Sequence, residues 1–501
     1  MKTNMNSWAN IGHLSQPEIK ALQNKTLYHF INTHLYPFSP YYRQLFDRQN
    51  IEPKSIRTVE DLRRLPFISK ANFVDEPQTQ EGKQKSLDFI LQPDAEKIRR
   101  FWLASRLLPM AALKILKGEE FVKEKLAQEY RPCFMTFTTG TTNKPIPFLY
   151  SNYDVQNLHI YGARMLEAMK IENQERIVSM FPYAPHLAFW QVVFGGLSKG
   201  ILILSTGGGK VMGTDGNIGA ILKMKPSVIL GVPSYVYHVI RTAREKGQKL
   251  DSIKRVVLGA GRVTEAFKER VRADLSAMGA KEVNVFGTYG FTEARAAWVE
   301  CPTPPGVSSG YHLYPDKEIF EIIDPQTGEV KGEGEDGEIV YTALDARASV
   351  VLRYRTGDFV KGGITFEPCP YCRRTVPRLS SDITRLSDVK DLDLSKIKGQ
   401  LVNLNNFDAC LSEFKAIKDW QIELRKKDND PHEIDELIVY VCPEDGVDRN
   451  QLEKDIKNTI LMATEVSPNA IIFVSFEEIV KRLQLETASK EKRILDTRPK
   501  N

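Results

Sequence analysis

The spacing of apolar residues predicts helices at the start of the chain. Apolar positions recur three and four residues apart in 18–32 and 41–49, as on the buried face of a helix. A shorter helix is predicted from Val59 to the loop at Pro66. Residues 76–130 keep helical spacing among many Lys, Glu and Gln residues, and we interpret them as an added helical segment.

One part of this added segment is unusually apolar. Residues 101–116 contain few polar side chains, although Arg106, Pro109 and Lys114 interrupt them. The chain nowhere reaches the ~18 consecutive apolar residues of a membrane span. We therefore expect a helix that is buried or faces a partner, in preference to one that lies in a membrane interface.

From about 131 to 360, short apolar runs alternate with helical stretches. Strands that alternate with helices are typical of parallel sheets with crossover connections, so an α/β core is predicted. The predicted strands are 177–181, 201–204, 228–230, 256–258 and 283–286.

The last third of the chain is predicted to contain further strands. A β-rich stretch covers 319–366, with turns at 327–328 and 336–337. From about 385, a final α+β unit contains a strand, a helix, a strand and a basic tail. Its first three elements are predicted at 436–442, 448–462 and 470–474.

Composition places the chain among ordinary globular proteins. Its 501 residues, of which 42% are hydrophobic and 27% charged, correspond to roughly three domains. Lys and Arg outnumber Asp and Glu by only 69 to 64, which does not favour a nucleic-acid partner. Six cysteines are too few for a disulfide scaffold and favour a reducing compartment. The N-terminus has no signal-peptide pattern, so we expect a cytoplasmic protein.

Two short motifs have the wrong context for the chemistry they suggest. Residues 196–200 read Gly-Leu-Ser-Lys-Gly, the nucleophile pattern of serine hydrolases, but a predicted helix precedes the serine and a strand follows it, which reverses the required order. Residues 259–261 read Gly-Ala-Gly after a strand, as in dinucleotide-binding loops. Thr264 stands where the third glycine belongs, so this reading is weak.

The most informative stretch is the polar loop 138–145, Thr-Thr-Gly-Thr-Thr-Asn-Lys-Pro. Its hydroxyls and backbone amides can donate hydrogen bonds to phosphate oxygens, its glycine lets the backbone approach, and its lysine supplies positive charge. A polar turn between strands is the alternative, but such a turn seldom needs four threonines in five positions. The loop is not a Walker loop, because Asn precedes the lysine and Pro follows it. The residues predicted to hold phosphate are Thr138, Thr139, Gly140, Thr141, Thr142 and Lys144.

Three motifs in the same order resemble those of the adenylate-forming enzymes. The loop 138–145 is similar to that family's phosphate loop, 289–293 (Tyr-Gly-Phe-Thr-Glu) to its Tyr-Gly-any-Thr-Glu element, and 354–358 (Tyr-Arg-Thr-Gly-Asp) to its Tyr-Arg-Thr-Gly-Asp element. Within the superfamily, the chain resembles most the phenylacetate-CoA ligase branch. The stretches that carry this resemblance are 40–42, 65–70, 233–235 and 490–498.

The resemblance implies an α/β fold in two parts and covers most of the chain except about 76–130. A large multi-layer N-terminal domain, 1–384, would bind ATP and the carboxylate, with the helical insertion inside it. A small mobile α+β domain, 385–501, would act as a lid. Residues 385–388 (Arg-Leu-Ser-Asp) are similar to the family's hinge element, with Asp388 as the hinge residue.

The resemblance also implies a two-step reaction with ATP, Mg²⁺ and CoA. A carboxylate is first adenylated with release of pyrophosphate, and a thiol, usually that of CoA, then displaces AMP. The first step brings two anions together, so charge must be neutralised at the α-phosphate. By motif matching, Thr142, Lys144 and Glu293 act in catalysis, Glu293 helps to hold Mg²⁺, and Asp358 accepts hydrogen bonds from the ribose hydroxyls. Further nucleotide-binding residues on this basis are Gly261, Tyr289, Gly290, Thr292 and Arg385.

A lysine near the C-terminus matches the residue that, in this family, stabilises charge at the forming acyl-phosphate bond. Lys490 fits the spacing of the Arg and Asp residues that follow it, and we prefer it. Ser489 replaces the family's glycine, and Lys492 is a second candidate.

Four cysteine and histidine positions could form a zinc site. Cys301 and His312, together with Cys369 and Cys372 of a Cys-Pro-Tyr-Cys run, would give a tetrahedral Cys₃His set. Redox chemistry would need the first cysteine of the run at a helix N-terminus, whereas its flanks predict strand or loop. Buried thiols without a metal are the other alternative.

In this family, loops after the core strands line the acyl site. Aromatic and small residues there would suit a flat aryl acid, and they would also suit an acyl chain. His186 could equally be a structural histidine. The candidates are Tyr183, His186, Gly259, Ala260, Phe286 and Gly287.

The predicted function is therefore an AMP-forming ligase of a small-molecule carboxylate, with CoA as acceptor. The first alternative is an adenylating enzyme that loads a carrier protein or another acceptor. The second is a catalytically silent relative that binds only a nucleotide or a partner, because Asn143, the hinge and the inserted helices depart from the family pattern. Oligomeric state is left open.

Overall fold

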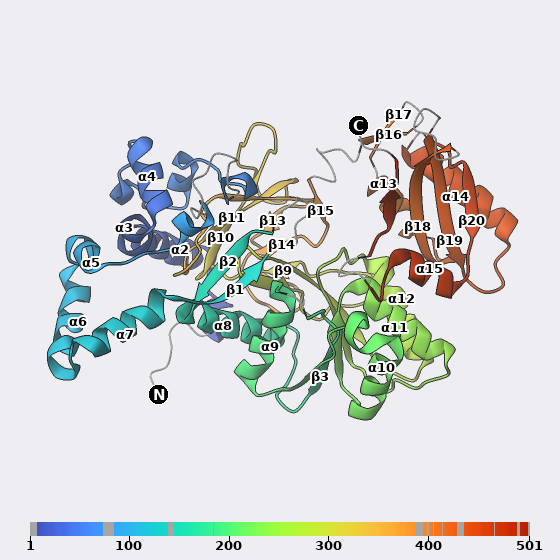
Figure 1. Cartoon of the computed structure of the whole chain (residues 1–501), viewed down its shortest axis with the longest axis horizontal. Coiled ribbons are helices and arrows are strands. Elements are labelled where there is room, and N and C mark those ends of the chain that lie inside the picture. The colour runs from blue at the N-terminus through green and yellow to red at the C-terminus, as the bar shows by residue number, and fades with distance from the viewer. Residues whose placement is uncertain are drawn as a thin grey trace.

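The computed structural model comprises a large body, residues 8–386, and a C-terminal unit, residues 394–498 (Figure 1). The described residues are 8–73, 85–138, 145–183, 185–386, 394–397, 400–403, 405–412, 414–427, 435–464, 466–487 and 491–498. In this part of the chain, no helix has both the length and the hydropathy needed to cross a bilayer.

The helices predicted at 18–32 and 41–49 are confirmed as α2 (Gln16–Phe30) and α4 (Pro40–Arg48). Two short helices, α1 (Trp8–Ile11) and α3 (Tyr36–Phe38), were not predicted. Helix α2 starts with a capping box, in which Ser15 and Glu18 satisfy amide groups of the first turn. The helix expected from Val59 is a 3₁₀ helix, Glu60–Arg64. These helices bury Phe30 and Tyr42 in the same core as Trp298 and Tyr341 of the strands that follow.

The added segment is helical where the structure describes it. Its helices are α5 (Ala95–Phe101), α6 (Ala104–Lys117) and α7 (Glu119–Tyr130), and they extend from one end of the body (Figure 1). The buried alternative for the helix at 101–116 is wrong, because α6 contains no buried residue, whereas the partner-facing alternative stays a prediction. Helix α6 packs along α7 and leaves its opposite side open.

A six-stranded sheet forms the centre of the body, as the alternating pattern predicted. Its strands are β3 (Arg176–Ser179), β4 (Leu202–Ser205), β5 (Val228–Gly231), β6 (Arg255–Leu258), β7 (Asn284–Phe291) and β8 (Ala296–Val299), in the order β4-β3-β5-β6-β7-β8. All neighbours are parallel except β7 and β8. Helices α8 (Asn152–Ala168), α9 (Leu187–Lys199), α10 (Gly209–Met224), α11 (Pro233–Glu245) and α12 (Glu265–Ala277) connect and cover it.

The inner parallel strands β3, β5 and β6 are buried on both faces, whereas the edge strand β4 is partly exposed. In β5, Val228 and Leu230 belong to a core with residues that precede β3, whereas Ile229 between them belongs to a second core with α11 and α12. Strands buried on both sides are continuous apolar runs. This is why the sequence located them correctly.

Three smaller sheets complete the body. Strands β1 (Pro132–Phe137) and β2 (Pro147–Ser151) form an antiparallel pair on either side of the polar loop. A second sheet has the order β10-β11-β12-β15, and a third has the order β13-β14-β9. Their bounds are β9 Tyr311–His312, β10 Glu318–Ile323, β11 Gly337–Ala343, β12 Tyr354–Val360, β13 Ile364–Thr365, β14 Arg378–Leu379 and β15 Ile383–Arg385.

The C-terminal unit is an α+β structure beside α10, α11 and α12 (Figure 1). Its sheet has the order β20-β19-β18-β21. The elements are β16 (Leu394–Ile397), β17 (Gln400–Asn403), α13 (Asn405–Ser412), β18 (Ile417–Lys426), β19 (Asp435–Pro443), α14 (Arg449–Thr464), β20 (Ala470–Phe473), α15 (Phe476–Leu483) and β21 (Ile494–Asp496). Residues of β19 and α15 share a core with α11 of the body.

Candidate functional site

A cavity of about 700 Å³ is lined by residues of both the body and the C-terminal unit. It lies beyond the carboxyl ends of β3, β5 and β6, where Phe181, Pro233 and Gly259 line it. Ligands of open α/β sheets bind at this edge, because loops from neighbouring strands converge there. Trp420 and Arg493 line the cavity from the C-terminal unit.

Three residues from three strands meet around one carboxylate in this cavity. The Tyr289 hydroxyl donates to Asp358 Oδ2 at 2.8 Å, and Arg385 Nη1 forms an ion pair with Asp358 Oδ1. Asp358 and Arg385 are register partners across β12 and β15. The Asp358 amide donates to Thr356 Oγ1 at 3.0 Å, which holds the backbone of β12 at this point.

Burial and charge act together on these groups. Burial raises the pKa of the Tyr289 hydroxyl well above its usual value, and the adjacent Asp358 charge raises it further. Burial alone would lower the pKa of Arg385, but the same carboxylate more than compensates and raises it. Arg385 therefore stays charged and forms a fixed ion pair with Asp358 at the cavity.

Glu293 forms a second acidic position in the cavity. The Tyr354 hydroxyl donates to Glu293 Oε1 at 2.7 Å. Burial raises the pKa of the Glu293 carboxyl, and the bond from Tyr354 offsets part of that rise. Burial without a paired cation disfavours the carboxylate, so a cation bound from outside would be stabilised here. Tyr354 begins the motif 354–358, although its sequence did not reveal the contact.

The beginning of the polar loop lies beside Glu293. Thr138 lines the cavity, exchanges hydrogen bonds of 3.0 and 3.1 Å with Ile146, and follows Phe137, whose carbonyl accepts from Thr292 Oγ1 at 3.4 Å. Glu293 and Thr138, the first residue of the predicted phosphate loop, therefore line the same cavity. The loop residues Thr139, Gly140, Thr141, Thr142 and Lys144 lie outside the described residues, as do Lys490 and Asp388.

The predicted nucleotide residues that are described line one cavity. They are Thr138, Gly261, Tyr289, Gly290, Thr292, Glu293, Asp358 and Arg385. Sequence reasoning missed the lining residues Lys70, Trp420 and Arg493. Arg493 is the clearest of them, because it forms ion pairs with Asp419 at 2.7 Å and Glu491 at 3.0 Å. The sequence signal for Arg493 was its place among the basic and acidic residues of the predicted tail.

The two lysine candidates are placed differently. Lys492 donates its backbone N–H to the Leu483 carbonyl at 3.1 Å, and its own carbonyl accepts from Gln421 at 2.7 Å. Its exposed side chain is outside the cavity lining, whereas the flanking Glu491 and Arg493 line the cavity. The structure thus places position 492 away from the cavity.

The predicted acyl residues divide into two groups. His186, Gly259 and Ala260 line the cavity. A Cβ atom at Gly259 would lie 2.4 Å from Thr288 Oγ1, so the close approach of the two strands requires glycine. His186 Nδ1 lies 3.2 Å from the Phe137 carbonyl oxygen.

The other three acyl candidates are placed outside the lining. The Tyr183 hydroxyl donates to the Ser205 carbonyl at 2.6 Å and the side chain is mostly exposed. Phe286 is buried among apolar residues of the central sheet. The Gly287 amide donates to Glu300 Oε2 at 2.5 Å. Each is thus held by a tertiary contact that the sequence did not reveal.

A Cys₃His cluster lies near the edge of the nucleotide region. Cys301 follows β8, His312 is in β9, and Cys369 and Cys372 lie between β13 and β14. All four potential ligand atoms are within 4.8 Å of one another, with Cys301 and Cys369 sulfurs 3.7 Å apart and Cys372 Sγ 3.2 Å from His312 Nε2. Tetrahedral Zn–S bonds of about 2.3 Å place sulfurs about 3.8 Å apart.

The second nitrogen of His312 also suits metal binding. His312 Nδ1 lies 3.4 Å from the Val299 carbonyl oxygen, which leaves Nε2 free to face the sulfurs. The pKa of the Cys372 thiol is lowered, chiefly by hydrogen bonding to Cys301, whose own pKa is raised by Cys369 and Cys372. The three thiols therefore compete for protons, and this cluster could hold a zinc ion.

Glu300 joins the cluster to the strand that carries Tyr289. Its carboxylate accepts from Lys268 Nζ at 2.8 and 2.7 Å and from the Gly287 amide at 2.5 Å. Glu300 directly precedes Cys301, and Gly287 lies two residues before Tyr289. A buried ion pair thus fixes the backbone between the two sites.

Comparison with known proteins gives consistent matches. The model of a family described as AMP-binding enzyme matches residues 45–343. A phenylacetate-coenzyme A ligase of Aromatoleum evansii is 26% identical over 502 residues, covering 97% of this chain and 96% of that protein. A phenylacetate-coenzyme A ligase of Thermus thermophilus is 26% identical over 385 residues, covering 75% of this chain and 72% of that protein.

Solved structures match over the whole chain. A 2-hydroxyisobutyryl-CoA ligase in the postadenylation state, in complex with R3-HIB-AMP, superposes with a TM-score of 0.74 at 16% identity, covering 99% of this chain and 94% of that chain. The same ligase with 2-HIB-AMP and CoA in the thioesterification state gives 0.62 at 18% identity, covering 98% and 92%. The α/β fold of adenylate-forming ligases therefore extends across the whole chain.

Proposed function

Because the chain belongs to the AMP-binding enzyme family, we propose that it activates a carboxylic acid with ATP and transfers the acyl group to the thiol of CoA. In the first step, a carboxylate oxygen attacks the α-phosphorus, and the bond to pyrophosphate breaks. In the second step, the thiol sulfur attacks the acyl carbon, its proton is lost and AMP leaves. One observation carries this proposal: Tyr289, Asp358 and Arg385 converge with Glu293 in a single cavity.

The Asp358 cluster provides the nucleotide end of the proposed site. Asp358 would accept hydrogen bonds from both ribose hydroxyls, and Tyr289 would lie against the adenine. Arg385 forms an ion pair with Asp358 and holds its carboxylate in place. The loop with Thr139, Gly140, Thr141, Thr142 and Lys144 would hold the outer phosphates. Its position in sequence directly after Thr138 supports this assignment.

Glu293 is the proposed Mg²⁺ ligand. A buried carboxylate with one hydroxyl partner suits a hard cation, which prefers carboxylate and phosphate oxygens. The ion would neutralise phosphate charge when bound. Tyr354 orients the carboxylate, and Thr138, the first residue of the phosphate loop, lines the same cavity as Thr292 and Glu293.

The small domain, 385–501, is proposed to act as a lid on the large domain 1–384, with Asp388 as its hinge. The lining residues Glu491 and Arg493 support this proposal, because they place the tail at the cavity. Lys490 directly precedes them and is proposed to stabilise the charge that develops during acyl transfer to phosphate. The exposed side chain of Lys492 favours Lys490 over it.

An aryl acid is the proposed substrate class. The part of the cavity near His186 has Phe181, Leu187 and Val192 with small residues Gly259 and Ala260. Apolar and aromatic walls with glycine at the strand ends leave room for a flat ring. The relatives named phenylacetate-coenzyme A ligase support the same class.

Zinc is proposed as a structural ion at Cys301, His312, Cys369 and Cys372. The 3.7 Å separation of two sulfurs and the outward contact of His312 Nδ1 support this. Such a site has four protein ligands and no open position, so its contribution would be to stability.

The test is exchange of labelled pyrophosphate into ATP over a panel of aryl and fatty acids. Acid-dependent exchange is expected, with thioester formation only when CoA is added. Lys490→Ala should retain ATP binding and lose thioester formation. Exchange with transfer to a carrier protein but not to CoA would support the alternative acceptor. Absence of exchange with every acid would overturn the ligase proposal and favour a nucleotide-binding relative without activity.

A further inference from the structure

The helices α5, α6 and α7 form an arm that extends from the body (Figure 1). Four large apolar side chains on this arm are unusually exposed. The exposed fractions are 85% for Ile115, 79% for Leu116, 71% for Leu103 and 68% for Leu108. Soluble proteins seldom gather such residues in one place without a binding role.

Helix α6 is apolar on two opposite sides. Leu107, Met110 and Leu113 are partly buried on the side toward α7. Leu108 and Ile115 are seven residues apart, and so they share the opposite side, next to Leu116. A helix with apolar residues around it is normally covered on both sides. We call the side with Leu108, Ile115 and Leu116 the outer face of α6.

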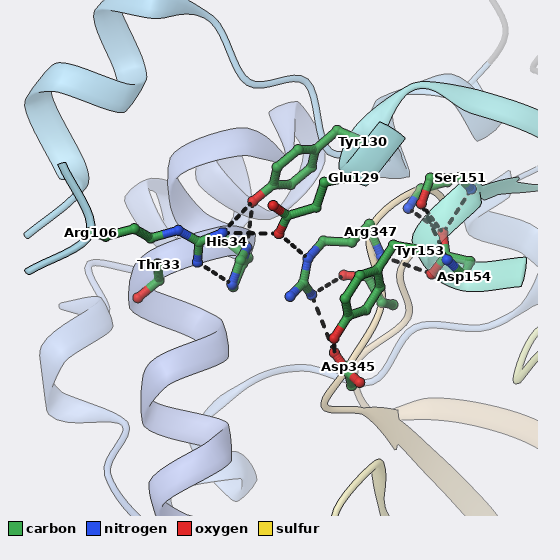
Figure 2. Close-up of polar contacts among 12 residues, drawn as sticks. Thr33, His34, Arg106, Glu129, Tyr130, Ser151, Tyr153, Asp154, Asp345 and Arg347 are labelled. Carbon is green, nitrogen blue, oxygen red and sulfur yellow. Dashed lines mark hydrogen bonds and ion pairs between the residues drawn. The ribbon is translucent and has the colours of Figure 1, made fainter. Parts of the chain in front are cut away.

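Buried polar contacts hold the arm in its extended position (Figure 2). Arg106 Nη2 donates to Glu129 Oε1 at 2.9 Å, and Arg347 Nε of the body donates to the same oxygen at 2.9 Å. His34 Nδ1 lies 2.7 Å from the Tyr130 hydroxyl. Because these contacts fix the base of the arm, the outer face cannot turn inward against the body without breaking them.

The part of the arm that carries the exposed apolar residues is also positively charged. Residues 97–117 contain six Lys or Arg and no Asp or Glu. Arg106 and Lys114 are paired with Glu129 and Glu119. Among the described residues, Arg99, Arg100 and Lys117 have no carboxylate partner. Positive charge beside an exposed apolar face is complementary to an anionic lipid surface.

The size of the outer face argues against a second copy of the chain as its partner. Helix α6 has 14 residues. At about 1.5 Å per residue and about 10 Å in diameter, one face gives a footprint of roughly 200 Å². A stable dimer buries about 800 Å² on each partner. A lipid surface needs no such area, because the face of an amphipathic helix enters the interface directly.

We propose that the arm docks on the surface of an anionic lipid bilayer. Leu108, Ile115 and Leu116 enter the headgroup boundary, and Phe121, exposed on α7 after the turn at Gly118, extends the same contact. The basic residues meet the lipid headgroups. This proposal differs from the buried or partner-facing helix that the sequence favoured, and it is independent of the ligase reaction.

Vesicle co-sedimentation tests the proposal with the full-length protein. The two probes are vesicles of phosphatidylcholine alone and vesicles with equal parts of phosphatidylcholine and phosphatidylglycerol. We expect about tenfold stronger binding to the anionic vesicles, reduced by high salt because surface charge is screened. Ile115→Glu with Leu116→Glu should abolish binding to both, since an acidic pair cannot enter an anionic interface.

Met462→Glu is the matched control, because Met462 on α14 is 87% exposed and lies in the C-terminal unit. It should bind vesicles like the unmodified protein. Thermal unfolding checks that the arm variant is folded, and light scattering without vesicles checks its mass. Equal vesicle binding by the arm variant and the unmodified protein, or no binding by either, would overturn the proposal. So would a dimer that the arm variant converts to a monomer, which would assign the face to a second copy.

Discussion

Two clusters of acidic groups in the body handle negative charge in different ways. Asp358 is neutralised by a cation that the chain supplies itself, the Arg385 guanidinium. At Cys301, Cys369 and Cys372, the partners of the thiols are one another and His312. The first arrangement is complete in the protein alone. The second can lose all its protons only when a metal ion replaces them.

Glu293 lies between these two cases. Its partner is a hydroxyl from Tyr354, which stabilises the carboxylate without neutralising it. The comparison therefore teaches which buried acids need an external cation. A carboxylate with its own arginine serves as a hydrogen-bond acceptor for ligands, and an acid without one marks a position for a metal or stays protonated.

The first prediction concerns Asp358, which is paired with Arg385 of the chain itself. Asp358→Ala should lower kcat/KM for ATP by about a thousandfold, because it removes a charged acceptor and leaves Arg385 and Tyr289 without their shared partner at the cavity. Pyrophosphate exchange measured against ATP concentration tests this. Asp382→Ala is the control, since Asp382 pairs with Arg262 at 3.2 Å on an exposed part of the body. Near-normal exchange by Asp358→Ala would contradict its assignment.

The second prediction concerns the Cys₃His cluster, the proposed zinc site. Cys369→Ser should abolish zinc binding and lower the free energy of unfolding by roughly 3 kcal/mol, because a structural metal is lost. Metal analysis and denaturant unfolding measure the two effects. Cys442→Ala removes another buried thiol, in β19, and should retain zinc. Zinc absent from the unmodified protein, purified without chelator, would count against the site.

Much of the α/β core could be predicted because its strands are continuous apolar runs. Strand β18, Ile417–Lys426, was missed although it is the longest strand of its sheet. The register shift between Ile417 and Asp419 affects only its first residues. Residues 420–425 alternate strictly between apolar and polar, so the local pattern did contain a strand signal here.

Local pattern has a limit at the candidate site. Motifs identified Tyr289, Glu293 and Asp358, since each lies in a run of characteristic residues. The exposure of α6 could not be read from the chain, because an apolar helix looks the same whether it is covered or open. Tyr183 resembled a cavity residue by position, and its bond to the Ser205 carbonyl depends on the packing of two separate strands.

The third prediction compares two buried glutamates of strand β10, one with a cation partner and one without. Glu318 is buried without a cation partner, and burial raises its pKa to about 8, whereas Glu321 on the same strand pairs with Arg353 at 3.0 Å. The folded state therefore holds a proton on Glu318 that the unfolded state releases above about pH 4.5. Stability should fall as pH rises from about 5 to 8, by roughly 3 kcal/mol.

Glu318→Gln should remove this pH dependence, because the amide cannot ionise. Thermal and denaturant unfolding at pH 5 and pH 8 would measure the difference. Glu321→Gln is the contrasting variant, and it should destabilise the protein at both pH values because it leaves Arg353 buried without its partner. A pH dependence that survives in Glu318→Gln would assign it to other groups.

The last prediction, with the smallest change in activity, tests whether Glu300 couples the Cys₃His cluster to Tyr289. Glu300 precedes the proposed zinc ligand Cys301 and accepts a hydrogen bond from the Gly287 amide of β7, which carries Tyr289. Glu300→Gln should raise KM for ATP about fivefold with a smaller change in kcat, because a weaker bond to Gly287 loosens the strand that carries Tyr289. Glu265→Gln is the matched control, since it removes another partner of the same Lys268 and leaves Gly287 untouched. Equal effects in both variants would show that the ion pair, and not the contact to β7, matters. Zinc content should stay unchanged in both variants, because neither Glu300 nor Glu265 is a proposed ligand. A higher KM for ATP with zinc retained would identify Glu300 as a positioning residue.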